Sequence, residues 1–310
     1  MNTVITPILN AMPYLTEALA SLEGQSFRDF EVCLWDNGST DGSVEEARRW
    51  IPDRLKGRVV TGEPLPLHEC LARMVEEAQT EFVARMDGDD VCLPERFERQ
   101  IAAMLKNPAL GIVGGQCIYI GPDGKQLIDQ EVLPMRHEDI LTQMLFRSAL
   151  THPALLFRRA AILEAGNYQL PKPIEDLDLY FRMSSRWRFQ NLNVPLLKYR
   201  IHPASICRSS EAEHAQKVVE VVGAHAPKVY GMTKENYLRL RNRQSGCAVA
   251  QLLASAWYRA GGLPRRYFEI VVSYFFIANG RCLTGSRDYF SKLVYRLLEL
   301  FVRKPMWRNC

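Results

Sequence analysis

The first 120 residues alternate short apolar runs with stretches in which apolar side chains recur every three or four positions. Short apolar runs bounded by turn residues predict buried strands, and the longer spacing predicts amphipathic helices. Repeated strand–helix units predict an α/β fold, with a Rossmann-like, mainly parallel central sheet and helices on both faces. The predicted strands cover residues 3–6, 30–35, 58–60, 81–86 and 111–120. The predicted helices cover residues 12–24, 43–51, 67–79 and 94–106.

The pattern is less regular after residue 120. Residues 151–168 predict a strand and then a short helix closed by Gly166, residues 175–185 predict a helix, and residues 189–202 predict two short strands. The remainder predicts mainly helix. We therefore expect an α/β domain over residues 1–207 and a helical C-terminal region over residues 208–310.

The composition is that of an ordinary globular protein, with 47% hydrophobic and 24% charged residues. Eight cysteines are scattered and form no CxxC or Cys/His cluster, so we expect reduced, mainly buried thiols and a cytoplasmic protein. The first residues, MNTVITPILN, lack the basic and apolar segments of a signal peptide. The longest apolar stretch, residues 270–278, is shorter than the roughly 20 residues that a membrane-spanning helix needs.

Charge is unevenly distributed along the chain. Residues 241–310 contain twelve Lys or Arg and three Asp or Glu, a balance of +9, so the net charge of +4 leaves −5 for residues 1–240. Basic residues of this tail interleave with aromatic ones, and residues 289–304 predict a basic amphipathic helix. Such a tail either attaches peripherally to an anionic membrane surface, or packs on the α/β domain or on a second copy in a homodimer. Nucleic acid is disfavoured as a partner, because the rest of the chain is acidic and carries no known binding motif.

Acidic residues follow two predicted strands at their carboxyl ends, where parallel sheets bind ligands. Asp36 opens the segment DNGSTDGS, which is either a simple strand-to-helix turn or a pocket for a base or ribose. Asp87, Asp89 and Asp90 belong to MDGDD. This is either a solvated acidic turn or a site for Mg²⁺ or Mn²⁺, which can hold a diphosphate. A cation between the carboxylates would offset their mutual repulsion.

Two later segments also carry candidate chemistry. The acids of EDLDLY (175–180) either stabilise a helix N-terminus or include a carboxylate general base. His202 in YRIHPAS is either a structural residue or a ligand of metal or phosphate.

In order and spacing, these motifs resemble the inverting family 2 glycosyltransferases, which have the GT-A fold. The matching segments span residues 3–206 and are TPILNAMPYLTEALASLEGQSFRDFEVCLWDNGSTDGS, EFVARMDGDDVCLPERFERQIAAMLKNPALGIVGG, THPALLFRRAAILEAGNY, EDLDLYFRM and LLKYRIHPASI. The resemblance implies transfer of a hexose or N-acetylhexosamine from a nucleotide diphosphate sugar, with UDP favoured by family precedent. The implied acceptor is a hydroxyl of a glycan or polyprenyl-linked glycan, in surface polysaccharide assembly such as that of O-antigen or capsule. The implied cofactor is Mn²⁺ or Mg²⁺.

The resemblance also implies roles for individual residues at the nucleotide end of the site. Pro7 and Asn10 line the nucleotide pocket, Asp36 bonds the base, and Asp41 lies near it. One departure from the family is Leu9, which stands where an aromatic residue usually precedes Asn10. Base stacking must then come from elsewhere.

A second set of implied roles concerns the diphosphate, the metal and catalysis. Asp89 is the implied metal ligand and Asp176 the implied general base. The residues implied to assist them are Arg85 and Asp87 near the ribose and donor sugar, Asp90 in support of the metal, His202 as a metal or more distant contact, Arg200 as a diphosphate contact, and Glu175 as an orienting neighbour of the base.

Two further departures from the family lie elsewhere. The segment before the Asp-x-Asp strand is ARMVEEA in place of one with N-x-G, and Ala165-Gly166-Asn167-Tyr168 stands in place of Gly-Gly-Tyr.

Rival interpretations are another two-carboxylate metal enzyme, such as a phosphatase or nucleotidyltransferase, and an inactive sugar-nucleotide-binding scaffold. The presence together of Asp36, Asp89 and Asp176 argues against the scaffold.

Overall fold

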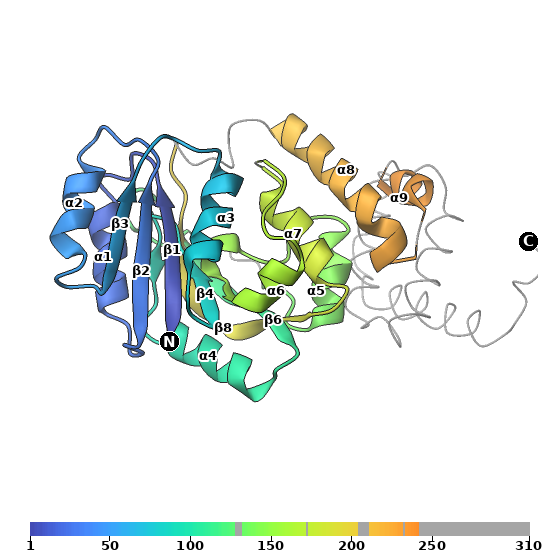
Figure 1. The fold of residues 1–310 in the computed structure, drawn as a ribbon. Coiled ribbons are helices and arrows are strands. Elements are labelled where there is room, and N and C mark those ends of the chain that lie inside the picture. The colour runs from blue at the N-terminus through green and yellow to red at the C-terminus, as the bar shows by residue number, and fades with distance from the viewer. Residues whose placement is uncertain (128–131, 172, 204–210, 232, 242–310) are drawn as a thin grey trace, which may run out of the picture. The chain divides into compact units, whose positions relative to one another are not determined.

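The computed structural model describes residues 1–127, 132–171, 173–203, 211–231 and 233–241 (Figure 1). The chain divides into two compact units, one of Met1–Ile140 with Ser148–Val221 and one of Leu141–Arg147 with Val222–Cys310. Every candidate site residue belongs to the first unit. The predicted boundary at residues 207 and 208 lies outside the described residues, as does the basic tail from residue 242 onward.

The first unit is built on an eight-stranded sheet with strand order β3–β2–β1–β4–β7–β6–β8–β5. β1, β2, β3 and β4 run parallel to one another, and β6 runs parallel to β8. β7 is antiparallel to both β4 and β6, and β5 is antiparallel to β8. The strands are β1 (Asn2–Ile8), β2 (Phe30–Asp36), β3 (Gly57–Thr61), β4 (Phe82–Arg85), β5 (Val91–Cys92), β6 (Leu110–Ile120), β7 (Leu156–Arg158) and β8 (Arg188–Arg200).

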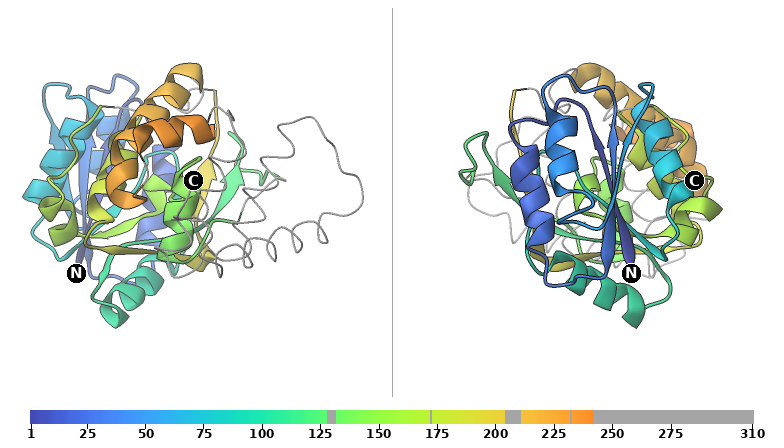
Figure 2. Two further views of the ribbon diagram at one scale, coloured as in Figure 1. Left: turned by 90° about the vertical axis from the view of Figure 1, so that its right-hand side faces the viewer. Right: turned by 60° about the vertical axis from the view of Figure 1, so that its left-hand side comes forward.

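Helices cover both faces of the parallel part of the sheet, as the sequence predicts. α1 and α2 lie on one face of β1–β3 and α3 lies on the other (Figures 1 and 2). The helices are α1 (Leu15–Glu23), α2 (Ser43–Trp50), α3 (Leu67–Glu77), α4 (Arg96–Lys106), α5 (His137–Met144), the short 3₁₀ helix η1 (His152–Ala154), α6 (Arg159–Glu164), α7 (Glu175–Met183), α8 (Glu211–Val229) and α9 (Lys234–Arg241). Among the residues that the structure describes, no helix is long and apolar enough to cross a membrane.

The central strands form the core, and their packing brings the candidate residues to one edge. Val4, Ile5, Val32 and Leu34 are at most 1% exposed, as expected for parallel strands covered on both faces. The register pairs Ile8 with the last residue of β2. β4 lies on the other side of β1, and the Met86 N–H just beyond it donates to the Ile5 carbonyl at 3.1 Å. The carboxyl ends of β2, β1 and β4 are therefore neighbours.

Three details differ from the sequence-based expectations. Residues 189–202 do not form two strands, because β8 is one strand whose pairing with β6 shifts register near Pro195. The irregularity accommodates a residue that has no N–H to donate to the ladder. The pattern also missed the helix α5 and the two-residue strand β5.

The second unit contains its own buried contacts. Val222, Ala226 and Tyr237 are fully buried there. The Tyr230 hydroxyl donates to the carbonyl of Leu141 at 2.6 Å, and the Tyr237 hydroxyl donates to that of Leu145 at 3.4 Å. The segment 141–147 is thus held by the helical residues beyond 221.

Candidate active site

The loops that follow β1 and β2 are tied together by Asn10. Its backbone N–H donates to the Ser39 hydroxyl at 2.8 Å, and its side-chain oxygen accepts the N–H of Thr40 at 2.9 Å. Asn10 adopts a left-handed φ of 52°, a conformation that Asn tolerates better than most residues. The two loops therefore form one polar rim at the carboxyl edge of the sheet.

Two aspartates shape this rim. Asp36 is 5% exposed, and its carboxylate accepts the N–H groups of Gly38 and Ser39 at 3.1–3.2 Å. Asp41 accepts the N–H of Met12 at 2.9 Å and the Ser43 hydroxyl at 2.6 Å. Burial of Asp41 opposes its charge, but these bonds outweigh burial and lower its pKa. Both aspartates therefore hold the turn. Oδ2 of Asp36 accepts both N–H groups, whereas Oδ1 accepts only that of Ser39 and keeps a lone pair for a further donor.

Three carboxylates gather just beyond β4. One oxygen each from Asp87, Asp89 and Asp90 lies within 4.8 Å of the other two. Gly88 permits this placement, because a Cβ there would stand 2.9 Å from the Ile8 side chain. The Asp-x-Asp segment is thus packed directly against the end of β1.

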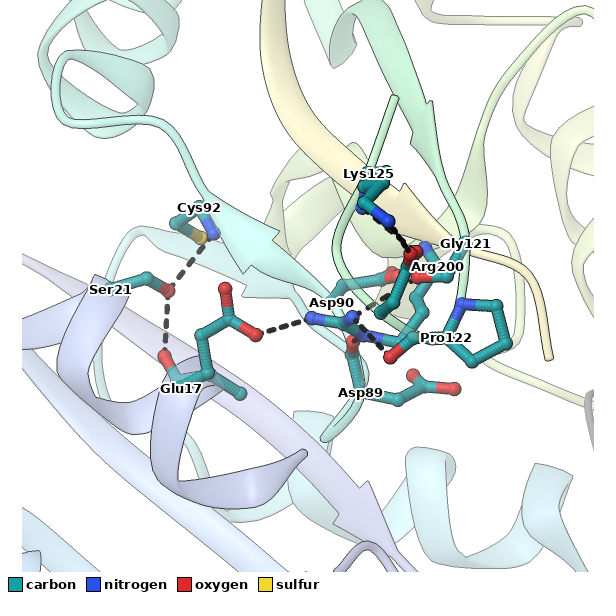
Figure 3. Close-up of polar contacts among 11 residues, drawn as sticks. Glu17, Ser21, Asp89, Asp90, Cys92, Gly121, Pro122, Lys125 and Arg200 are labelled. Carbon is teal, nitrogen blue, oxygen red and sulfur yellow. Dashed lines mark hydrogen bonds and ion pairs between the residues drawn. The ribbon is translucent and has the colours of Figure 1, made fainter. Parts of the chain in front are cut away.

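Basic side chains surround this cluster. Arg85 forms a 2.6 Å ion pair with Asp87, and the His202 Nε2 lies 2.9 Å from an Asp89 carboxylate oxygen. The backbone N–H of Arg200 donates to Asp90 at 2.8 Å. Figure 3 shows Arg200 between the acidic segment, Glu17 and the turn at Gly121 and Pro122.

The pKa values in the cluster reflect burial and like charge. Burial, and next the charge of Asp87, raise the pKa of Asp89, while His202 opposes the rise. Asp90 is 1% exposed, and burial with the charges of Asp87 and Asp89 raises its pKa well above the usual range. A cation bound between these groups would relieve this repulsion.

Asp176 lies in the first turn of α7, where the sequence predicts the general base. Burial raises its pKa to about 6, against the Leu177 N–H, which donates to its carboxylate at 2.7 Å, and the charge of Arg85, which both lower it. Asp178 in the same helix has a different environment, because it forms a 2.8 Å ion pair with Arg182. The raised pKa of Asp176 is typical of a group that accepts a proton in a reaction.

Arg85 connects the base candidate with the acidic cluster. Its charge lowers the pKa of Asp176, and its guanidinium is ion-paired with Asp87. Tyr168 also lies in this electrostatic neighbourhood, and its hydroxyl is 2.8 Å from the Nε2 of His152. Burial raises the pKa of Tyr168, whereas burial and then Arg85 lower that of His152 well below its ordinary value. We interpret this set as one continuous polar site.

Residues 3–164 match the family model described as Glycosyl transferase family 2. The chain belongs to glycosyl transferase family 2. The enzyme is 32% identical over 188 residues to the amylovoran biosynthesis glycosyltransferase AmsE of Erwinia amylovora, covering 60% of this chain and 70% of AmsE. It is 30% identical over 216 residues to the O-antigen biosynthesis glycosyltransferase WbnJ of Escherichia coli, covering 68% of this chain and 84% of WbnJ.

Solved structures share the fold of this glycosyltransferase. Residues 1–349 of S. aureus TarS in complex with UDP-GlcNAc match with a TM-score of 0.59 at 17% identity, covering 97% of this chain and 91% of that one. The mannosyltransferase PcManGT from Pyrobaculum calidifontis, in complex with GDP-Man and Mn²⁺, matches with a TM-score of 0.59 at 18% identity, covering 100% and 88%. The predicted GT-A fold and the predicted enzyme class are confirmed.

The structure of the glycosyltransferase brings the candidate residues together in three groups. The first lies at the ends of β1 and β2, the second between the ends of β4 and β8, and the third at the start of α7. In order, these groups are Asn10, Asp36 and Asp41; Arg85, Asp87, Asp89, Asp90, Arg200 and His202; and Glu175 and Asp176. Their roles stay predictions.

Two residues that the sequence predicts as donor contacts, Pro7 and Arg200, are buried. Pro7 is buried within β1, where it pairs with Trp35 of β2. Arg200 is 2% exposed, and its side-chain N–H groups are directed to backbone carbonyls and Glu17.

Several residues of the enzyme's site were missed from the sequence. Ser39 accepts the Asn10 N–H, Tyr168 and His152 lie beside the base candidate, and Glu17 pairs with Arg200. Ser39 lies inside the DNGSTDGS motif, so its signal was available. Glu17 has no local signal, because its partner lies 183 residues away.

Proposed function

We propose that this enzyme moves a hexose or N-acetylhexosamine, with inversion, from a UDP-linked nucleotide sugar to a hydroxyl of a glycan or lipid-linked glycan. The setting we propose is surface polysaccharide biosynthesis. That setting is supported by relatives named for amylovoran and O-antigen biosynthesis. TarS, crystallised with UDP-GlcNAc, supports the donor class, although PcManGT was crystallised with GDP-Man.

The observation that carries this proposal is the fit of the acidic cluster to a divalent metal. Asp87, Asp89 and Asp90 converge within 4.8 Å and offer the hard oxygen ligands that Mg²⁺ and Mn²⁺ prefer. The second carboxylate oxygen of Asp90 is buried and has no hydrogen-bond partner among the described residues. When bound, the metal would neutralise the diphosphate leaving group as a Lewis acid. We assign Asp89 as a ligand, with Asp90 and His202 in support.

We assign Asp176 as the general base that takes the proton of the acceptor hydroxyl. A carboxylate whose pKa is about 6 is deprotonated at neutral pH, yet it is a stronger base than an ordinary aspartate. Glu175, its neighbour, orients a sugar. A single displacement at C1 inverts the anomeric centre, so an α-linked donor gives a β-linked product.

The nucleotide is assigned to the rim at the ends of β1 and β2. Oδ1 of Asp36 accepts only the Ser39 N–H and retains a lone pair beyond its bond to the turn, and this capacity supports a contact with the N–H of a base. Pro7, Asn10 and Asp41 form the remainder of this subsite in our proposal. Arg85 and Asp87 would then lie toward the ribose and the donor sugar.

The proposal places the enzyme on the cytoplasmic side of the membrane, where polyprenyl-linked acceptors are built. The +9 balance of residues 241–310 supports peripheral attachment to anionic lipid, with packing or homodimerisation as the alternative. We also propose two domains, one over residues 1–207 and one over residues 208–310.

The test is calorimetry of the purified protein against UDP, GDP and dTDP, each with and without Mn²⁺. We expect UDP to bind tightest and Mn²⁺ to strengthen its binding. Equal binding with and without Mn²⁺ would contradict the proposed role of the metal. If GDP binds tightest, the donor is a GDP-linked sugar and not a UDP-linked one.

Inversion is tested by NMR of the product linkage formed from the donor that the calorimetry selects. A product with the donor's own anomeric configuration contradicts inversion. Nucleotide binding without transfer to any acceptor would favour an inactive sugar-nucleotide-binding domain.

A further inference from the structure

We propose that Arg200 is a positioning residue for the Asp-x-Asp segment and is itself held by Glu17, so that it does not contact the donor diphosphate. This inference rests on the proposed metal role of Asp89 and deepens it. Nothing in the sequence places Glu17 near this site.

The guanidinium of Arg200 is already occupied by protein groups. Its Nε–H donates to the Asp89 carbonyl at 2.8 Å, and Nη1 donates to the carbonyls of Gly121 and Pro122 at 3.2 and 3.4 Å. The other terminal nitrogen forms an ion pair with Glu17. Four of its five N–H groups are thus used, and the side chain is 2% exposed. Recognition of a diphosphate by arginine normally uses an open fork of two parallel N–H groups.

The contacts of residues 200–202 fix Asp89 and Asp90 from one side. The Arg200 backbone N–H holds the Asp90 carboxylate at 2.8 Å, while its side chain holds the Asp89 carbonyl. Two residues later, His202 approaches the Asp89 carboxylate at 2.9 Å. The backbone and the carboxylate of Asp89 are therefore both anchored to the end of β8.

α1 and its N-cap residue also contact Arg200 and His202. The guanidinium carbon of Arg200 lies 4.6 Å from the Tyr14 ring centroid, and that ring lies 5.0 Å from the His202 ring. Ser21, one turn after Glu17, accepts the N–H of Cys92 at 2.9 Å (Figure 3). α1 and its N-cap residue thus contact Arg200, His202 and the strand that follows the acidic segment.

This arrangement predicts an effect on metal affinity without loss of a ligand. Groups that orient metal ligands typically contribute roughly 10- to 100-fold to metal affinity or activity. Glu17 acts through its ion pair with Arg200, and its side chain is half exposed. Its replacement should therefore lower the metal affinity less than replacement of Arg200 itself.

The experiment is a calorimetric titration of Mn²⁺ into the full-length protein saturated with UDP, for the wild type and the variants Glu17→Gln and Arg200→Lys. The control is Glu23→Gln, which removes another partly exposed α1 carboxylate, ion-paired with Arg54 away from the acidic cluster. We expect Mn²⁺ affinity to fall roughly 3- to 10-fold in Glu17→Gln and more than 10-fold in Arg200→Lys, and to be unchanged in Glu23→Gln. UDP affinity without metal should be the same in all four proteins.

Three results would overturn the inference. Wild-type Mn²⁺ affinity in both Glu17→Gln and Arg200→Lys excludes a positioning role. Weaker UDP binding in Arg200→Lys without metal assigns Arg200 to the diphosphate instead. A wild type that binds UDP without any dependence on Mn²⁺ overturns the proposed metal role, and this inference with it. Because Arg200 is buried, thermal unfolding checks that each variant is folded. If Arg200→Lys does not fold, the result for Glu17→Gln, a change at a half-exposed side chain, decides the question.

Discussion

At the scale of single residues, the acidic segment shows how the fold accommodates like charges. Asp87 is paired with Arg85, Asp89 with His202, and Asp90 with the backbone of Arg200. Each carboxylate thus has its own partner, and the partners come from β4 and the end of β8. The carboxylates are therefore held close together by the protein, in an arrangement suited to a cation.

Replacement of Asp176 by Asn should separate catalysis from binding. We expect transfer to fall roughly 10²- to 10⁴-fold, because the general base is lost, while calorimetric affinity for the donor nucleotide stays unchanged. Full activity of the variant would move the base to another group, and Glu175 would be examined first.

The same substitution should stabilise the fold at alkaline pH. The pKa of Asp176 is about 6 against an ordinary value of 3.8, so its contribution to stability is greatest at low pH and is lost as the pH rises through 6. We expect the free energy of unfolding of Asp176→Asn to exceed that of the wild type by roughly 1 to 3 kcal/mol at pH 8. This difference should disappear near pH 4. Asp178→Asn is the control, and it should be less stable than the wild type because it breaks the ion pair with Arg182.

The pH dependence of the reaction should report the same group. Protonation of Asp176 removes the base, so kcat should fall about tenfold for each pH unit below about 6. Initial rates at saturating donor and acceptor measure this profile. A flat profile between pH 5 and 7 would contradict the assignment.

At the scale of the elements, the sequence predicts most of the sheet but little of how its second half closes the site. Apolar runs such as residues 30–35 locate the strands, and the parallel topology then places Asp36 and Asp87 at one edge. The contacts of Glu17, Tyr14 and Arg200 depend on β8 returning to α1 after more than 180 residues. No local periodicity encodes such a contact, and the two-residue strand β5 is too short to give a pattern.

Gly88 offers a test of the packing between this segment and β1. In Gly88→Ala, the new Cβ would stand 2.9 Å from the Ile8 Cγ2 and 3.1 Å from the Ala11 Cβ. We expect a loss of roughly 1 to 3 kcal/mol in unfolding free energy and weaker Mn²⁺ binding, because the carboxylates shift. Gly62→Ala, where a Cβ meets nothing within 4 Å, should change neither quantity. Equal behaviour of the two variants would show that the loop adjusts without effect on the site.

At the scale of the whole chain, charge distinguishes the tail from the rest of the sequence. The +9 tail follows a body of −5, and this charge is the basis for our proposal that the tail binds anionic lipid. The family match ends at residue 164, and the tail therefore lies outside the matched region. Its role must be tested on the full-length protein.

Flotation with lipid vesicles supplies that test. We expect the full-length protein to bind vesicles containing anionic phospholipid at low salt and to dissociate in high salt, since each basic residue near the surface contributes about 1 kcal/mol. Neutral phosphatidylcholine vesicles are the control. A variant with Arg281, Arg287, Lys292 and Arg296 changed to Gln should bind less, and unchanged binding would favour the packing or dimer alternative.

The separation of Glu17 from Arg200 along the chain has a consequence for biosynthesis. A ribosome that adds 5–20 residues per second takes roughly 10 to 40 s to translate the 183 residues between them. For most of that time the nascent chain carries all three aspartates of the acidic segment but not the arginine that anchors them. We therefore expect ribosome-bound fragments to begin folding their parallel strands before they bind metal, so that competence for the reaction is acquired late in synthesis.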